Sequence, residues 1–149
     1  MKKLALLLLL ALPLLGQTKF DRAKFEIRHE KFVLDNGLTV LVHEDHSVPV
    51  VGVNVWYHVG SRNEKRGKTG FAHLFEHFFF NGSEHYPHGF REAMDDLGAN
   101  NRNGTTNEDR TNFFEDVPVS ALERTLYLEA DRLGFLAAQI NQEMLERER

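Results

Sequence analysis

The chain has 149 residues, a formal net charge of −4 and no cysteine. Charges of both signs are interspersed, so the sequence predicts neither a basic stripe for nucleic acid nor a polybasic patch for a membrane surface. The absence of cysteine excludes disulfide bonds, thiolate metal ligands and a cysteine nucleophile. The length is sufficient for one domain with a packed core.

The amino terminus has the pattern of a targeting segment. Lysines precede a leucine-rich run, Leu4–Leu12, which is too short to span a bilayer as a stable helix. We therefore expect residues 1–16 to be a cleaved signal peptide, with an uncleaved membrane anchor as the alternative. The mature protein is then periplasmic or secreted. Residues 17–31 are a polar leader, residues 32–149 form the main domain, and no other segment is apolar enough to cross a membrane.

Strand signals come next along the chain. Two β-rich runs within residues 32–42 flank a D-N-G turn at 35–37, which predicts a hairpin. Residues 49–59 form a long β-branched and aromatic run, which we interpret as a central strand. Residues 60–69 are polar and contain glycine, so they predict a loop.

The segment from Gly70 to Asn81 contains no proline and is predicted to be a helix that carries an H-x-x-E-H motif. Residues four apart lie one above the other on a helix, so His73 and His77 can bind one metal ion. Glu76 lies on the same side and can hold a metal-bound water without being a ligand. The phenylalanines of this segment are expected to pack as core under the helix; they are Phe71, Phe75, Phe78, Phe79 and Phe80.

These residue types fit zinc chemistry. Zn²⁺ binds neutral imidazoles and carboxylates, and a catalytic zinc site keeps one position open for water. The metal lowers the pKa of that water, and a neighbouring carboxylate takes its proton. The motif alone is also compatible with a helix that carries two surface histidines and a solvated glutamate. The helix supplies two ligands and a base, so a third ligand must come from another segment.

The remaining elements follow in order. A short helix over 90–97 ends at Gly98, residues 99–106 are rich in Asn, Gly and Thr, and residues 111–117 form a strand. Pro118 then opens a long helix. A further helix begins near Gln142 and is expected to continue past Arg149. The apolar stripe predicted for the long helix consists of Leu122, Leu126, Leu128, Ala130, Leu133 and Leu136.

Several separated segments resemble, in order, the pitrilysin/insulysin family of zinc metallopeptidases, which includes the mitochondrial processing peptidase. The resemblance extends over residues 32–149 and is more specific than the zinc motif by itself. It is carried by the segments L-D-N-G-L-T-V (34–40), V-W-Y-H-V-G-S-R (55–62), T-G-F-A-H-L-F-E-H (69–77), N-G-T-T (103–106), D-R-T-N-F (109–113) and L-E-A-D-R-L (128–133).

The resemblance implies roles for individual residues. It identifies His73 and His77 as zinc ligands and Glu76 as the general base that activates the zinc-bound water toward the scissile carbonyl. The third ligand of the family, a glutamate, is expected a few residues beyond Arg149, so the chain as given is expected to be inactive. Glu148 corresponds to a glutamate that supports the ligands, and an ordinary solvated helix charge is the alternative for it.

The resemblance also implies a fold, a substrate and partners. The fold is α+β, a mostly antiparallel sheet with helices packed on one face. Asn103 corresponds to a position beside the cleft, on an edge strand to which a peptide substrate adds as a further strand; a turn residue beside Gly104 is its alternative. Family members carry a further homologous domain or a partner subunit.

Two functions from different classes remain open from the sequence. The first is a zinc-dependent endopeptidase that hydrolyses peptides or unfolded segments. The second is a non-catalytic partner subunit or scaffold of the same family, because the third zinc ligand is absent from the chain. The intact His73, Glu76 and His77 favour the first. A third relative with an H-x-x-E-H helix, S-ribosylhomocysteine lyase, is set aside because it requires cysteines.

Overall fold

This computed structural model describes residues 26–148, which form two compact units that divide after His46. The predicted signal peptide, residues 1–16, lies outside the described residues, and so does most of the leader. Among the residues described, no helix is both long enough and apolar enough to cross a membrane.

The first unit contains the predicted hairpin. Strands β1 (Glu30–Val33) and β2 (Thr39–Val42) pair in antiparallel register. The turn between them needs a left-handed residue, and Gly37 supplies it with a φ of 87°. The Gly37 amide donates to the Leu34 carbonyl at 2.8 Å, which closes the turn.

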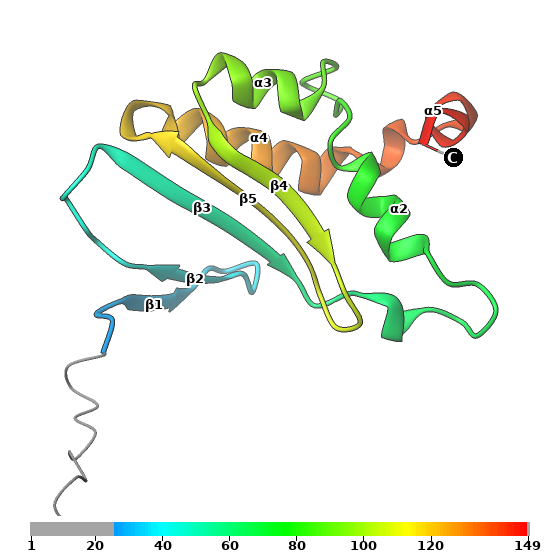
Figure 1. Cartoon of the computed structure of the whole chain (residues 1–149), viewed down its shortest axis with the longest axis horizontal. Coiled ribbons are helices and arrows are strands. Elements are labelled where there is room, and N and C mark those ends of the chain that lie inside the picture. Colours follow the sequence, from blue (N-terminus) through cyan, green and yellow to red (C-terminus); the bar gives the residue numbers. More distant parts are fainter. Residues whose placement is uncertain (1–25, 149) are drawn as a thin grey trace, which may run out of the picture. The chain divides into compact units, whose positions relative to one another are not determined.

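The second unit is built on a three-stranded antiparallel sheet in the order β3-β5-β4 (Figure 1). The strands are β3 (Val50–Tyr57), β4 (Asn100–Thr106) and β5 (Thr111–Pro118). The prediction of a central strand at 49–59 is therefore wrong within the described residues, because β5 is the strand with a partner on each side. The apolar run of β3 arises because alternate residues such as Val51 and Val53 pack against the core.

Strand β4 forms from a sequence with little strand propensity, rich in Asn and Gly. Its formation depends on the turn at residues 107–110, where the Asn107 side-chain oxygen accepts hydrogen bonds from the amides of Asp109 and Arg110. This turn aligns β4 with β5, although the register shifts between Asn100 and Asn103. Tertiary pairing thus outweighs local preference in this segment.

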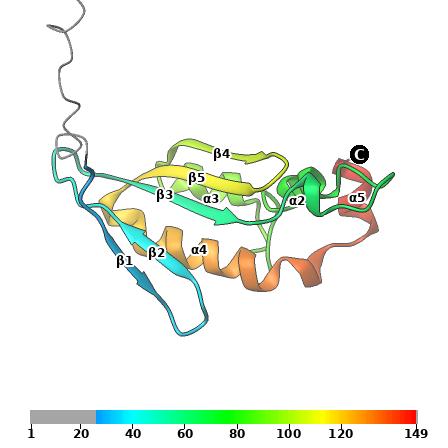
Figure 2. The ribbon, with the colours of Figure 1, turned by 90° about the horizontal axis from the view of Figure 1, so that it is seen from below.

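Helices α3 (Phe90–Asp96) and α4 (Leu122–Phe135) pack on one face of this sheet (Figure 2). Their core cluster contains Phe90, Ala93, Met94, Ala99, Val117, Ala121 and Leu128. Helices α2 (Phe71–Phe78) and α5 (Gln142–Glu148) share a second cluster made of Phe78, Leu136 and Met144. Short 3-10 turns lie at η3 (Ser61–Asn63), η4 (Val119–Ala121) and η5 (Ala137–Gln139). The predicted α+β class is confirmed.

The apolar stripe predicted for α4 is only partly right. Leu128 and Leu136 are buried, but Leu126 and Leu133 are each about half exposed. The buried face instead consists of Thr125, Leu128, Glu129, Arg132 and Leu136. Charged side chains occupy this face because they are paired with one another inside the core, which periodicity of apolar residues does not reveal.

The expected packing of the phenylalanines under α2 also needs correction. Phe78 is buried, whereas Phe71 and Phe75 are exposed, although all three lie on one face of α2 at positions i, i+4 and i+7. Only the carboxyl-terminal end of this face is covered, because Phe78 packs against Leu136 and Met144. The exposed pair lines a pocket beside the motif.

Candidate functional site

The amino-terminal end of α2 is held by a side chain from the preceding loop. The Gly70 backbone has a φ of 104°, and no side chain of the N-cap residue itself closes the helix. Instead, the two carboxylate oxygens of Glu64 accept hydrogen bonds from the amides of Gly70 at 2.8 Å and Ala72 at 2.7 Å. A carboxylate at a helix N-terminus also interacts favourably with the helix dipole. The loop therefore fixes where the motif helix starts.

That loop is in turn attached to the β4–β5 turn. The amides of Ser61 and Arg62 donate to the backbone carbonyls of Asn107 and Glu108 at 3.0 and 2.9 Å. Gly60 permits this approach, because a Cβ built on it would lie 2.2 Å from the Asn107 carbonyl oxygen. The start of α2 and the end of β4 are thus held together by backbone contacts.

The motif residues lie on α2 as the sequence predicts. The imidazole rings of His73 and His77 are one helical turn apart, with centroids separated by 4.9 Å, and both side chains are exposed. Glu76 is buried, with 8% of its surface accessible. Two accessible imidazoles on adjacent turns are a suitable donor pair for zinc. Among residues 26–148 no group of three potential ligand side chains is placed to hold a metal ion.

Glu148 on α5 contacts the second histidine. Its Oε2 lies 3.4 Å from Nδ1 of His77, and its Oε1 accepts a hydrogen bond from the Asn81 side chain at 3.2 Å. A carboxylate beside one ring nitrogen orients an imidazole whose other nitrogen is available to a metal. The supporting role that the family resemblance implies for Glu148 stays a prediction, as does its alternative of a solvated helix charge.

Glu76 lies against strand β4. Its Oε2 accepts a hydrogen bond from Thr106 Oγ1 at 2.5 Å. Gly104 makes room for it, because a Cβ on that residue would be 3.0 Å from Cγ of Glu76 and 3.0 Å from the Phe113 ring. The carboxylate is therefore buried between the helix and the strand.

Asn103 lies on β4, which is an edge strand of the three-stranded sheet among the described residues. It is exposed and pairs with Phe114. Because Gly104 and Thr106 face Glu76, alternation along the strand places the Asn103 side chain on the opposite face of the sheet. The strand position is as predicted, and contact with a substrate stays a prediction.

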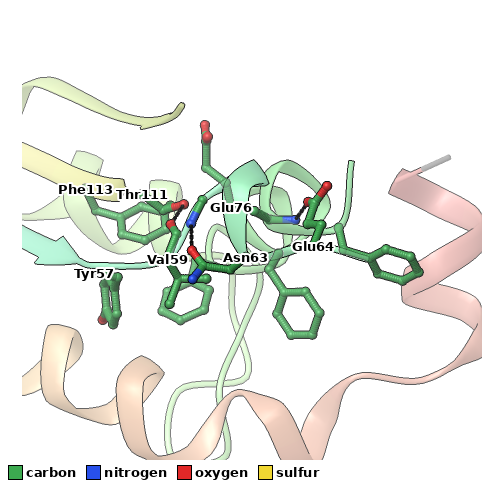
Figure 3. A pocket seen from close by; sticks show the side chains of 12 residues that line it. Tyr57, Val59, Asn63, Glu64, Glu76, Thr111 and Phe113 are labelled. Carbon is green, nitrogen blue, oxygen red and sulfur yellow. Dashed lines mark hydrogen bonds between the residues drawn. The ribbon is translucent and has the colours of Figure 1, made fainter. Parts of the chain in front are cut away.

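An apolar pocket of about 300 Å³ lies beside Glu76 (Figure 3). The loop, α2 and the ends of β3 and β5 contribute to its lining, which includes Tyr57, Val59, Phe71, Phe75, Phe79 and Phe113. The Tyr57 hydroxyl is buried and has no hydrogen-bond partner among the described residues. Burial, followed by the charge of Glu129, raises the pKa of Tyr57 to about 12. Tyr57 is therefore a neutral wall residue at physiological pH.

Beneath the sheet, charged residues are enclosed by aromatic rings. Arg132 pairs with Glu129, and its guanidinium carbon lies 3.6 Å from the centre of the Phe90 ring and 4.4 Å from that of Phe113. One of its nitrogens also donates to the Phe79 carbonyl at 3.2 Å, at the carboxyl end of α2. The cluster of Glu129 and Arg132 thus anchors α2 to α4.

A further buried carboxyl group belongs to Glu115 on β5. Burial, followed by the charge of Glu129, raises the pKa of Glu115 to about 8.

Asp131 forms a second anchor. Its carboxylate accepts hydrogen bonds from the Ser83 hydroxyl and from Nδ1 of His85, the latter at 2.6 Å. Burial opposes ionisation, but the hydrogen bonds from Ser83 and His85 outweigh it and lower the pKa of Asp131. Ser83 bonds to the aspartate and not to the histidine, so the trio lacks the serine–histidine contact of a hydrolytic triad. It attaches the loop after α2 to α4.

Sequence reasoning missed Glu64, which caps α2, Thr106, which bonds to Glu76, and Thr111, which lines the pocket. Glu64 precedes α2 by six residues in a polar loop, and nothing local distinguishes it from a solvated charge. Thr106 falls within the N-G-T-T segment that carries the family resemblance, which was the available signal.

Residues 39–149 match the family described as Insulinase (Peptidase family M16). The chain belongs to this family. The match covers α2 with its motif, the strands β3 to β5 and the helices α3 to α5. The resemblance noted in the sequence is therefore confirmed.

Named relatives include proteases and one subunit of a complex. The chain is 33% identical over 122 residues to the zinc protease PqqE of Helicobacter pylori, across 81% of this chain. It is 31% identical over 144 residues to cytochrome b-c1 complex subunit 1 of Rattus norvegicus, across 95% of this chain. Among solved structures, a protease from Helicobacter pylori matches with a TM-score of 0.75 at 32% identity, and pitrilysin with a TM-score of 0.72 at 28% identity, each across 81% of this chain.

The chain spans less than a third of each of these proteins. It covers 28% of PqqE, 29% of the cytochrome b-c1 subunit, 29% of the Helicobacter pylori protease structure and 13% of the pitrilysin chain.

Proposed function

We propose that this chain is the metal-binding part of a zinc-dependent endopeptidase that hydrolyses peptides or unfolded segments. The observation that carries the proposal is the arrangement on α2, where two accessible imidazoles lie beside a buried carboxylate. The relatives named zinc proteases support it. In the proposal the third ligand comes from beyond Arg149, and a further homologous domain or partner subunit completes the enzyme.

His73 and His77 would hold the zinc ion, and Glu148 would orient the ring of His77. Zinc, when bound, supplies a Lewis acid that polarises a carbonyl and lowers the pKa of water. Glu76 would take the proton from the attacking water and pass it to the leaving amine. Its one hydrogen bond from Thr106 leaves the second carboxylate oxygen available for this transfer.

The open edge of β4 is the proposed binding site of the peptide. The Asn107 amide donates to the Arg110 carbonyl, so residues 107 and 110 form a hydrogen-bonded pair. Such pairs alternate along antiparallel strands, and therefore the backbone groups of Gly104 and Thr106 point away from β5. An extended peptide that bonds to these groups would lie next to Glu76. Asn103 would contact it from the other face of the strand.

The experiment is a hydrolysis assay on the full-length protein with an internally quenched peptide, combined with measurement of bound zinc. We expect Glu76→Gln to retain zinc and lose about 10²- to 10⁴-fold in kcat, since it removes the general base. His73→Ala should lose zinc and activity together. Glu84→Gln, an exposed change on the loop after α2, is the matched control and should match the wild type. Full activity of Glu76→Gln would refute the proposal.

A non-catalytic role is the second candidate. The similarity to cytochrome b-c1 complex subunit 1 favours it, since that name describes a subunit of an assembly and not a protease. In this case the full-length protein would co-purify in a complex, bind little zinc and hydrolyse no peptide. The same assay therefore separates the two candidates.

The signal-peptide prediction leads to a proposal about location. We propose that the mature protein is exported to the periplasm or secreted, with an amino-terminal membrane anchor as the alternative. Fractionation of cells followed by amino-terminal sequencing tests it. A mature protein that begins near residue 17 in the soluble exported fraction is expected, and a cytoplasmic protein that begins at Met1 would refute the proposal.

A further inference from the structure

A line of oxygen atoms leads from Glu76 into the sheet. Glu76 Oε2 accepts a hydrogen bond from Thr106 Oγ1 at 2.5 Å, and Thr106 Oγ1 lies 3.2 Å from Thr111 Oγ1. Thr111 Oγ1 donates to the Val59 carbonyl at 3.0 Å. The line therefore connects α2 to the neighbouring ends of all three strands of the sheet.

The hydrogens available to this line decide its direction. Each threonine hydroxyl has one hydrogen. The hydrogen of Thr111 is used on the Val59 carbonyl, which can only accept. The single hydrogen of Thr106 is donated to Oε2 of Glu76, so the 3.2 Å contact between the two threonine oxygens carries no hydrogen.

The donor is also rigid. Thr106 and Thr111 are opposite each other in the β4–β5 register, at a pair that does not exchange backbone hydrogen bonds, where side chains approach most closely. Threonine has few χ1 conformations because it is β-branched. Gly104, two residues before Thr106, leaves the space that the methylene groups of Glu76 occupy. The carboxylate therefore cannot move toward the strand or rotate freely.

We propose that Thr106 is a positioning residue for the general base. Its hydroxyl fixes Oε2 of Glu76, which leaves Oε1 as the oxygen that meets the attacking water. Among the described residues no side chain or amide donates to Oε1. This inference rests on the proposed peptidase function and adds to it a residue that acts through Glu76, without contact with substrate or metal.

The test uses the full-length protein with Thr106→Val, Thr106→Ser and Thr39→Val. Valine keeps the shape of threonine and removes the donor, so kcat should fall about 10- to 100-fold because the base is misplaced. KM for the quenched peptide and the affinity for zinc should stay unchanged. Serine restores the hydroxyl and should recover most of kcat. Thr39→Val is the matched control, because Thr39 is an exposed threonine on β2, outside the proposed site, and the change should leave kcat unchanged.

A crystal structure of each variant gives a readout that does not depend on activity. Displacement of the Glu76 carboxylate in Thr106→Val, with its return in Thr106→Ser, supports the proposal even when the wild type hydrolyses no peptide. That outcome separates failure of the proposed function from failure of this inference. An unmoved carboxylate in Thr106→Val, or a kcat equal to that of the wild type, overturns the positioning role. If Thr106→Val does not fold, Thr106→Ala takes its place, and the position of the Glu76 carboxylate and kcat are compared with the wild type in the same way.

Discussion

Helices α2 and α4 both bury acidic side chains, yet they do so in different ways. On α2, Glu76 has a hydrogen bond to one of its two oxygens and lies beside accessible imidazoles and an apolar pocket. On α4, Glu129 bonds through both oxygens to Arg132, which is covered by the rings of Phe90 and Phe113.

This difference distinguishes a buried charge that is available for a chemical reaction from one that only stabilises the fold. A buried charge is destabilising unless it is paired, so a fully paired one is explained by the fold alone. A buried carboxylate with a free oxygen next to accessible imidazoles is not explained in this way. The position of α2 then depends on contacts from other segments, chiefly Glu64 and Gly60.

The largest effect is expected on α4, from Arg132→Met. The change leaves Glu129 buried without its partner, and we expect a loss of about 3–5 kcal/mol in the free energy of unfolding. Urea denaturation of the full-length protein measures it. Arg124→Met, an exposed arginine on the same helix, is the control and should change stability by less than about 0.5 kcal/mol. A similar small effect for both would contradict the assignment of Arg132 as the core partner.

The second prediction concerns pH and Glu115. Burial raises its pKa to about 8 in the folded protein, so the folded state holds a proton that the unfolded chain releases above its ordinary pKa. Stability should therefore fall as pH rises from about 5 to about 8, by about 1 kcal/mol for each pH unit. Glu115→Gln should remove this slope and be more stable than the wild type near pH 8. If denaturation curves of Glu115→Gln keep the wild-type slope, another group is responsible; Glu123→Gln, exposed on α4, is the control.

The third prediction acts on the attachment of α2. A Cβ at Gly60 would meet the backbone of Asn107 and Glu108, so Gly60→Ala should lower the free energy of unfolding by about 1–3 kcal/mol. It should also lower kcat, because the start of α2 moves. Gly134→Ala is a control of opposite sign: its Cβ meets nothing, and alanine should stabilise α4 by up to about 1 kcal/mol. Equal changes in the free energy of unfolding for Gly60→Ala and Gly134→Ala would contradict the prediction, because they would mean that a methyl group at Gly60 fits without moving the backbone.

The smallest effect is expected for Glu64→Ala. The change removes the two acceptors for the amides of Gly70 and Ala72, and a lost helix cap costs about 1 kcal/mol. Hydrogen exchange of these two amides should become several-fold faster, while α4 amides keep their protection. Glu108→Ala, on the β4–β5 turn, is the control. Unchanged exchange at Ala72 would mean that another group caps the helix.

Much of the fold could be predicted from local patterns. The D-N-G turn, the helix ended by Gly98 and the strand at 111–117 each depend on residues close in sequence, and the structure contains all three. The H-x-x-E-H spacing likewise placed His73 and His77 on adjacent turns. These predictions succeeded because helix and turn geometry is fixed by neighbouring residues.

Other features could not be predicted in this way. Strand β4 has weak propensity and depends on β5 for its partner. The charged inner face of α4 contradicts an apolar stripe because Glu129 and Arg132 pair with each other inside the core. In both cases the stabilising contact exists only in the folded protein, and no periodic pattern of apolar residues in the sequence indicates it.

The sequence by itself determined the hairpin turn, the main helices, the family segments and the residue types that can bind zinc and accept a proton. The tertiary structure alone decided that Glu76 lies against Thr106, that Glu148 faces His77 and that Glu64 caps α2. The reason is physical. The residue type fixes the chemistry of a side chain. Its orientation depends on residues that are distant in the sequence and contact it only when the sheet and helices pack together.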